Sequence, residues 1–124
     1  MTASENLAAL AARTWERTLE LNPTLATVYG DERFDDRLDD PGPVGRAARR
    51  SLADETLAAA TAIPAASLGE EERITRELLR VAAATEIADD ETRMDLVGAV
   101  QQQGHQALLP ELVQFQRADT PERL

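Results

Sequence analysis

The stretch from residue 22 to 38 constrains the fold most, because it fixes where one helix ends and the next begins. Asn22 can cap the free amides of a new helix, and Pro23 suits the first helical position, where no amide hydrogen is needed. Gly30 can adopt the left-handed conformation that ends a helix. We therefore expect a short helix over residues 23–29, turned sharply away from whatever precedes it.

Three longer helices are expected over residues 4–21, 43–62 and 68–88. Ser4 begins the first and Pro43 suits the start of the second. The third follows Ser67-Leu-Gly-Glu70, which matches the capping-box pattern. A charged loop over residues 30–42 and an irregular C-terminal region complete an all-α chain with four main helices.

The apolar stripes on these helices are rich in alanine. Leu, Ile, Val and Phe together make up 27 of 124 residues, about 22%, and alanine buries little area. The expected inward faces are, on the first helix, Ala8, Ala11, Trp15 and Leu19; on the second, Ala48, Leu52, Thr56, Ala59 and Ile63; and on the third, Ile74, Leu78, Val81, Thr85 and Ala88, widened by Leu79, Ala82, Ala83 and Ile87. Trp15, on such a stripe, is interpreted as a core residue. The helices should form readily, but their packing against one another should be thin.

The net charge of −10 disfavours nucleic acid and anionic membranes as partners. The chain has no cysteine, no recognisable signal peptide and no apolar run long enough to span a membrane. We therefore expect a cytoplasmic protein. Arg46, Arg49 and Arg50 lie near a helix start, where the helix dipole disfavours them, and we expect them to form ion pairs with the acidic loop 31–40.

The pattern N-P-x-x-A-T-x-x-G-D-x-R-[FY]-D-D-R-L in residues 22–38 resembles the N-terminal signature of the domain of unknown function 885 family. The resemblance implies that a full-length relative is a zinc-dependent, peptidase-like hydrolase several times longer than this chain. It also implies a set of motif residues that are structural or line the substrate cleft: Asn22, Gly30, Asp31, Arg33, Asp36 and Arg37. For the four charged members, Asp31, Arg33, Asp36 and Arg37, the structural interpretation is a network of ion pairs between loop and helix.

Catalytic motifs were not found in the sequence. A zinc peptidase needs H-E-x-x-H or a related motif, and the one histidine, His105, has no such residues around it. The clustered aspartates of the loop do not match a calcium loop. We assign no catalytic or metal-binding residue, and zinc is implied only for a full-length relative.

The sequence therefore predicts that residues 1–124 are the non-catalytic, N-terminal helical part of a larger domain, truncated at the C-terminus. Thr120 and Pro121 resemble the start of a further helix. The expected partner is the remainder of the same protein or a helical partner. The alternative is a self-contained acidic helical protein that serves interaction or oligomerisation.

Overall fold

The computed structural model describes residues 1–97, 104–116 and 119–121, and all regular structure in these ranges is helical. The all-α prediction is confirmed. The α-helices are α1 (Ala3–Leu21), α2 (Pro23–Val28), α3 (Pro43–Ala62), α4 (Glu70–Glu91) and α5 (His105–Phe115). Single 3-10 turns are η1 (Glu32–Phe34), η2 (Ala65–Ser67) and η3 (Met94–Leu96).

The helix boundaries follow local capping chemistry. α3 covers the expected residues and begins at Pro43. α1 begins one residue earlier than expected, because Thr2 rather than Ser4 caps it: the Glu5 amide donates to the Thr2 hydroxyl at 3.2 Å, and the Thr2 amide donates to the Glu5 carboxylate at 2.7 Å.

The expected cap of α4 is wrong. Ser67 lies in η2, and α4 begins two residues later than expected. The Gly69 amide donates to the Glu72 carboxylate at 2.8 Å instead. The helix ends at Glu91, three residues later than expected.

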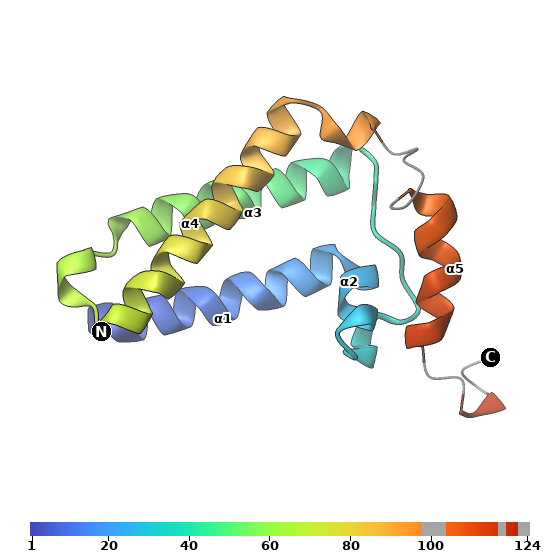
Figure 1. The fold of residues 1–124 in the computed structure, drawn as a ribbon, viewed down its shortest axis with the longest axis horizontal. Coiled ribbons are helices and arrows are strands. Elements are labelled where there is room, and N and C mark those ends of the chain that lie inside the picture. The colour runs from blue at the N-terminus through green and yellow to red at the C-terminus, as the bar shows by residue number, and fades with distance from the viewer. Residues whose placement is uncertain (98–103, 117–118, 122–124) are drawn as a thin grey trace.

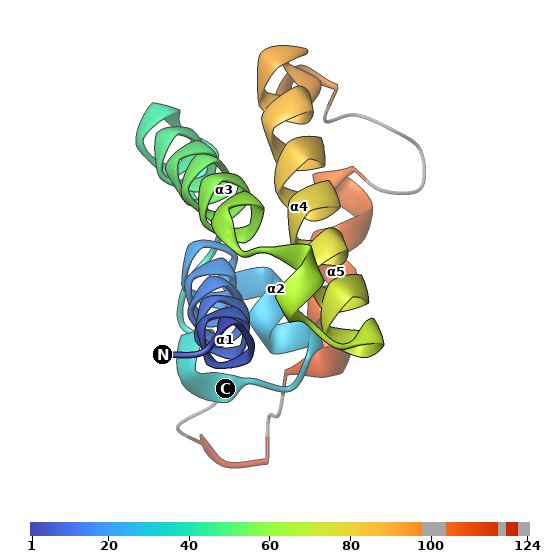
Figure 2. The same ribbon diagram turned by 90° about the vertical axis from the view of Figure 1, so that its left-hand side faces the viewer.

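α3 and α4 form a helical hairpin that lies across α1 (Figures 1 and 2). α2 turns away from the end of α1, and α5 lies against α2. The side-chain amide of Gln116, just after α5, donates to the carbonyl oxygen of Asp35 at 3.2 Å. In this arrangement a cavity opens between α1 and the hairpin.

The core occupies the end of the molecule near the N-terminus, beneath the connection between α3 and α4. Its members come from α1, from the end of α3 and from the connection: Leu7, Leu10, Ala60, Ile63 and Leu68. Within the described residues no large side chain is completely buried. The packing is therefore as thin as the alanine-rich composition predicts.

Trp15 does not belong to this core, so its predicted role is wrong. Its side chain is 44% exposed and meets the ring of Tyr29 edge-on, with centroids 5.3 Å apart. Leu7, Leu10 and Leu19 are the buried residues of α1. The inward face is rotated because α3 packs on the leucine side, while the turn at Asn22 brings α2 towards Trp15.

The predicted inward face of α4 is wrong for three of its central residues and right for Leu79 and Ala83, two of the residues that widen it. Ile74, Leu78 and Val81, which we call the outer stripe of α4, are 56%, 64% and 56% exposed. Leu79 packs against the core, and Ala83 is the buried residue of the helix. Both sides of α4 carry apolar residues, and the hairpin uses the side with the smaller ones.

No helix in the described ranges is long and apolar enough to cross a membrane. The expected start of a further helix after Thr120 falls largely on residues 122–124, which lie outside the described residues.

Candidate functional site

The residues of the 22–38 motif mainly hold one another in place. The Asn22 side-chain amide donates to the Thr18 carbonyl oxygen at 2.7 Å, which closes α1 where α2 begins. Gly30 has a φ of +80°, in the left-handed region that glycine tolerates. The Thr27 hydroxyl donates to the Asp35 carboxylate at 2.7 Å and so ties the loop back to α2.

Asp31 and Arg33 lie together on the surface. The Arg33 guanidinium donates to both oxygens of the Asp31 carboxylate and, at 3.0 Å, to the Glu16 carboxylate on α1. These bonds hold the pKa of Asp31 below its ordinary value and raise the pKa of Arg33. This part of the motif links the loop to α1 by an ion pair.

Asp36 and Arg37 are exposed, and Arg37 lies over the same Phe34 ring as Arg33, whose guanidinium carbon is 5.1 Å from the ring centroid. The Arg37 guanidinium stacks over the Phe34 ring, 4.6 Å from its centroid. Asp36 makes no hydrogen bond or ion pair within the described ranges. Of the candidate residues, Arg33 and Arg37 therefore meet at one ring, and Asp36 does not join them.

The arginines at the start of α3 do not pair with the acidic loop, so that prediction is wrong. Arg46 and Arg50 both bind the Asp90 carboxylate near the end of α4, and Arg50 also reaches Glu91 at 3.3 Å. The hairpin brings these residues together although they lie 40 or more positions apart. Arg49 donates to the backbone oxygen of Asp40 at 3.0 Å.

These ion pairs relieve two unfavourable arrangements at once. Cations at a helix start and anions at a helix end each oppose the helix dipole. Pairing Arg46 and Arg50 with Asp90 offsets both, and the hydrogen bonds from Arg46 and then Arg50 hold the pKa of Asp90 below its ordinary value.

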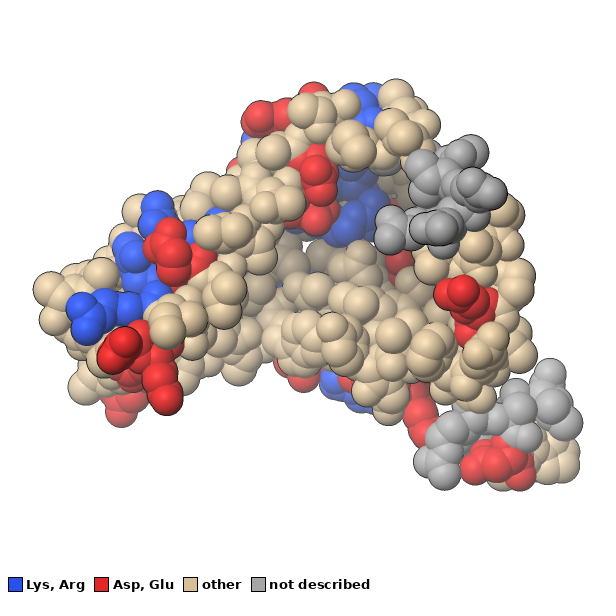
Figure 3. All heavy atoms as spheres, viewed as in Figure 1, with Lys and Arg blue, Asp and Glu red and all other residues tan. Residues whose placement is uncertain are grey.

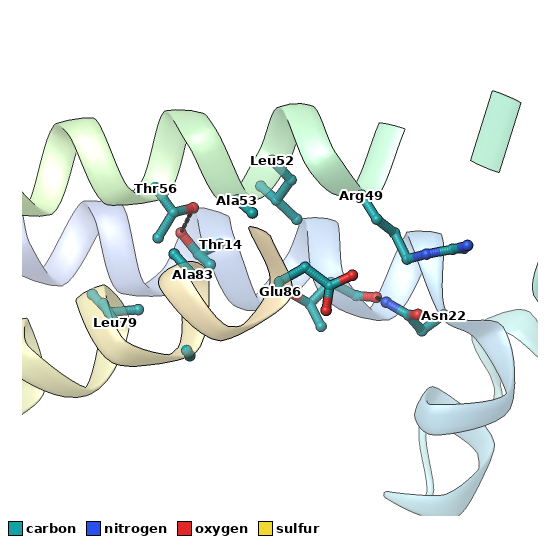
Figure 4. A pocket seen from close by; sticks show the side chains of 11 residues that line it. Thr14, Asn22, Arg49, Leu52, Ala53, Thr56, Leu79, Ala83 and Glu86 are labelled. Atoms are coloured by element: carbon teal, nitrogen blue, oxygen red, sulfur yellow. Dashed lines mark hydrogen bonds between the residues drawn. The ribbon is translucent and has the colours of Figure 1, made fainter. Parts of the chain in front are cut away.

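A cavity of about 180 Å³ opens between α1, α3 and α4. Its apolar wall consists of Leu52, Ala53, Leu79, Ala82 and Ala83. Its polar wall consists of Thr14, Thr18, Asn22, Arg49, Thr56 and Glu86 (Figure 4). Figure 3 shows the molecule hollowed between α4, α1 and α5, with charged side chains along the upper edge of the hollow.

In this cavity a motif residue shares a concave surface with charged residues from elsewhere in the chain. Asn22 lies beside Arg49 and Glu86 at one end (Figure 4). Deeper in, the hydroxyls of Thr14 and Thr56 lie 3.2 Å apart and hydrogen bond. Sequence reasoning missed Arg49 and Glu86 as neighbours, because no local spacing connects them and only the hairpin brings them together.

The residues that the structure describes do not form a site that suits a zinc ion. Within the described ranges no three His, Cys, Asp or Glu side chains converge on one point. His105 is the first residue of α5, and its side chain lies outside what the structure describes.

The fold places this chain in the class of all-α proteins. Its core is thin, ion pairs hold α3 and α4 together, and an apolar stripe on α4 is exposed. The chain belongs to the family described as bacterial protein of unknown function (DUF885), whose model matches residues 23–124. The comparisons with curated proteins and with solved structures gave no match.

Proposed function

We propose that this chain is a non-catalytic helical part of a larger DUF885 protein and that its outer stripe of α4 packs against the remainder. The full-length protein would be a metal-dependent, peptidase-like hydrolase, as the likeness of the 22–38 motif implies, with its catalytic residues outside this chain. Residues 1–124 would then form one wall of the substrate cleft.

The exposure of α4 carries this proposal. Ile74, Leu78 and Val81 are each more than half exposed and follow one another at helical spacing. Contiguous apolar residues on a protein surface usually mark a site that contacts another surface. Among the described residues, Val113 of α5 is also 69% exposed, so the apolar exposure is not confined to one helix.

Amide hydrogen exchange tests the packing part of the proposal. The 124-residue chain should be compared with the protein expressed from the reading frame extended beyond Leu124, if the frame continues. We expect residues 74–81 to be strongly protected in the longer protein and weakly protected in the chain alone. Equal protection in both proteins would contradict the proposal.

Peptidase activity tests the other part. The longer protein should hydrolyse a mixed peptide library, lose that activity to a chelator and regain it with zinc, whereas the 124-residue chain should be inactive throughout. Activity of the short chain alone would overturn the non-catalytic assignment.

The alternative function is self-association through the same stripe. The spacing of Ile74, Leu78, Val81 and Thr85, alternating four and three residues, is that of a coiled-coil seam. Light scattering decides between the two: a stable dimer of the 124-residue chain, broken by Leu78→Glu, favours the alternative, and a monomer favours the first proposal.

A further inference from the structure

We propose that the cavity between α1, α3 and α4 binds a small zwitterion, an amino acid with an aliphatic side chain. Its carboxylate would meet Arg49, its ammonium group would meet Glu86, and its side chain would lie on the apolar wall. This inference concerns the short chain by itself and does not depend on the proposed function.

Among the described residues, neither of the two charged groups at the cavity has an ionic partner. Arg49 donates to one backbone oxygen, that of Asp40, which leaves most of its guanidinium hydrogens unused. The Glu86 carboxylate makes no hydrogen bond or ion pair within the described residues. The neighbouring arginines of α3 behave differently, since Arg46 and Arg50 are both paired with Asp90.

The arrangement of these charges selects a ligand that carries both signs. Arg49 comes from α3 and Glu86 from α4, and both side chains lie at the same end of the cavity (Figure 4). They do not pair with each other, so a ligand group can bind each one. Asn22 lies beside them, and its side-chain carbonyl oxygen accepts no hydrogen bond within the described part of the chain. This oxygen is a second acceptor for an ammonium group.

The rest of the cavity fits a short aliphatic group. Leu79 and Ala83 lie at the end away from the charges (Figure 4). An apolar cavity of about 150 Å³ accommodates benzene, so the 180 Å³ here accommodates a side chain of three or four carbons beside its charged groups. None of the lining residues is aromatic, so the wall offers no ring to stack on a planar ligand.

A ligand series on the unmodified chain tests the proposal without any variant. L-leucine should be titrated by nuclear magnetic resonance against 4-methylpentanoate, which lacks the ammonium group, and 3-methylbutylamine, which lacks the carboxylate. We expect leucine to bind at least about tenfold more tightly than either analogue, because each charged hydrogen bond contributes about that factor. The amide shifts should centre on Thr14, Thr56 and Ala83.

Variants test the two charges separately. Arg49→Gln and Glu86→Gln should each weaken leucine binding at least about tenfold. Arg73→Gln and Glu71→Gln remove the same charges from exposed positions on α4 and should leave binding unchanged. Circular dichroism confirms that each variant is folded.

Several results would overturn the proposal. These are leucine binding no tighter than that of both analogues, a lack of saturable shifts up to the solubility of leucine, or equal effects of the cavity variants and their controls. If a cavity variant does not fold, the ligand series still decides. Tight binding of the carboxylate analogue alone would assign the cavity to simple carboxylates instead.

Discussion

A matched pair of leucine substitutions measures how much of the apolar surface of this chain is used internally. Leu10 is 4% exposed and belongs to the core, whereas Leu78 is 64% exposed on the outer stripe of α4. The same change, Leu→Ala, removes the same atoms from both sites. Any difference in the free energy of unfolding therefore reports the surroundings and not the chemistry.

The expected magnitudes differ several-fold. Leu→Ala in well-packed cores lowers the free energy of unfolding by about 2.7–5 kcal/mol. The lower end of this range applies where the surroundings collapse and leave no cavity. Leu10 also lines an open hollow of about 370 Å³ near the N-terminus. Because water and neighbouring side chains can enter such a site, we expect about 3 kcal/mol for Leu10→Ala. Leu78→Ala should destabilise by roughly 0.5 kcal/mol, typical of a surface change.

Urea unfolding followed by circular dichroism measures both values, with the oligomeric state checked at the same concentration. A loss of 3 kcal/mol is a large share of the 5–15 kcal/mol that stabilises a domain and should lower Tm by roughly 12 °C. Equal effects of the two substitutions in a monomer would refute the reasoning, because they would show that Leu78 is buried within this chain. In the longer protein, Leu78→Ala should become as costly as Leu10→Ala.

Three further changes test the polar framework. Gly45→Ala should lower Tm, although alanine is the better helix former by about 1 kcal/mol, because the new Cβ would lie 2.2 Å from the carbonyl oxygen of Asp40; an unchanged melt would contradict this. Asp90→Asn should lower Tm at neutral pH. Because the folded-state pKa of Asp90 is lowered, the stabilisation is present above the unfolded-state pKa of about 3.9 and is lost as pH falls through the folded value. The two melts should therefore converge in acid, at pH values below the folded-state pKa of Asp90, and a gap that persists there would count against the assignment. Arg76→Ala should destabilise by about 2 kcal/mol in urea, because its guanidinium donates to two carbonyl oxygens at the end of α3 at 2.8 and 3.2 Å. Arg73→Ala, at an exposed position on the same helix, should change stability by less than about 0.5 kcal/mol, and similar losses for the two would show that the carbonyl contacts contribute nothing.

The helix boundaries could be predicted because their causes are local. Pro43 begins α3 and Asn22-Pro23 separates α1 from α2, as the sequence indicated. A cap depends on residues within one turn. Even so, the sequence offers neighbouring residues that could each cap α1, and Thr2 rather than Ser4 does so.

The inward faces could not be predicted, because alanine makes both sides of a helix weakly apolar. On α4, Ile74 and Leu78 repeat at the same spacing as Leu79 and Ala83. Periodicity shows that such stripes exist, but it does not show which one meets another helix. The partner helix decides, and small residues permit the closer approach.

The charge contacts were mispredicted for a related reason. The acidic loop was chosen as the partner of Arg46 and Arg50 because it is close in sequence, whereas Asp90 is close in space. The same long-range approach of α3 and α4 creates the cavity beside Arg49 and Glu86. Both the ion pairs and the cavity result from the packing of α3 against α4, which cannot be predicted from a local sequence pattern.

The contacts on the inner side of α4 also explain why its outer stripe must stay outside. Arg76 holds the end of α3 at one end of the helix, and Asp90 binds Arg46 and Arg50 at the other. Rotating α4 to bury Leu78 would break the contacts at both ends and expose Ala83. The charged contacts therefore fix the orientation of the helix against the preference of its largest apolar residues. The proposal that a partner surface covers the outer stripe would explain why the sequence retains large apolar side chains on a face that cannot turn inward.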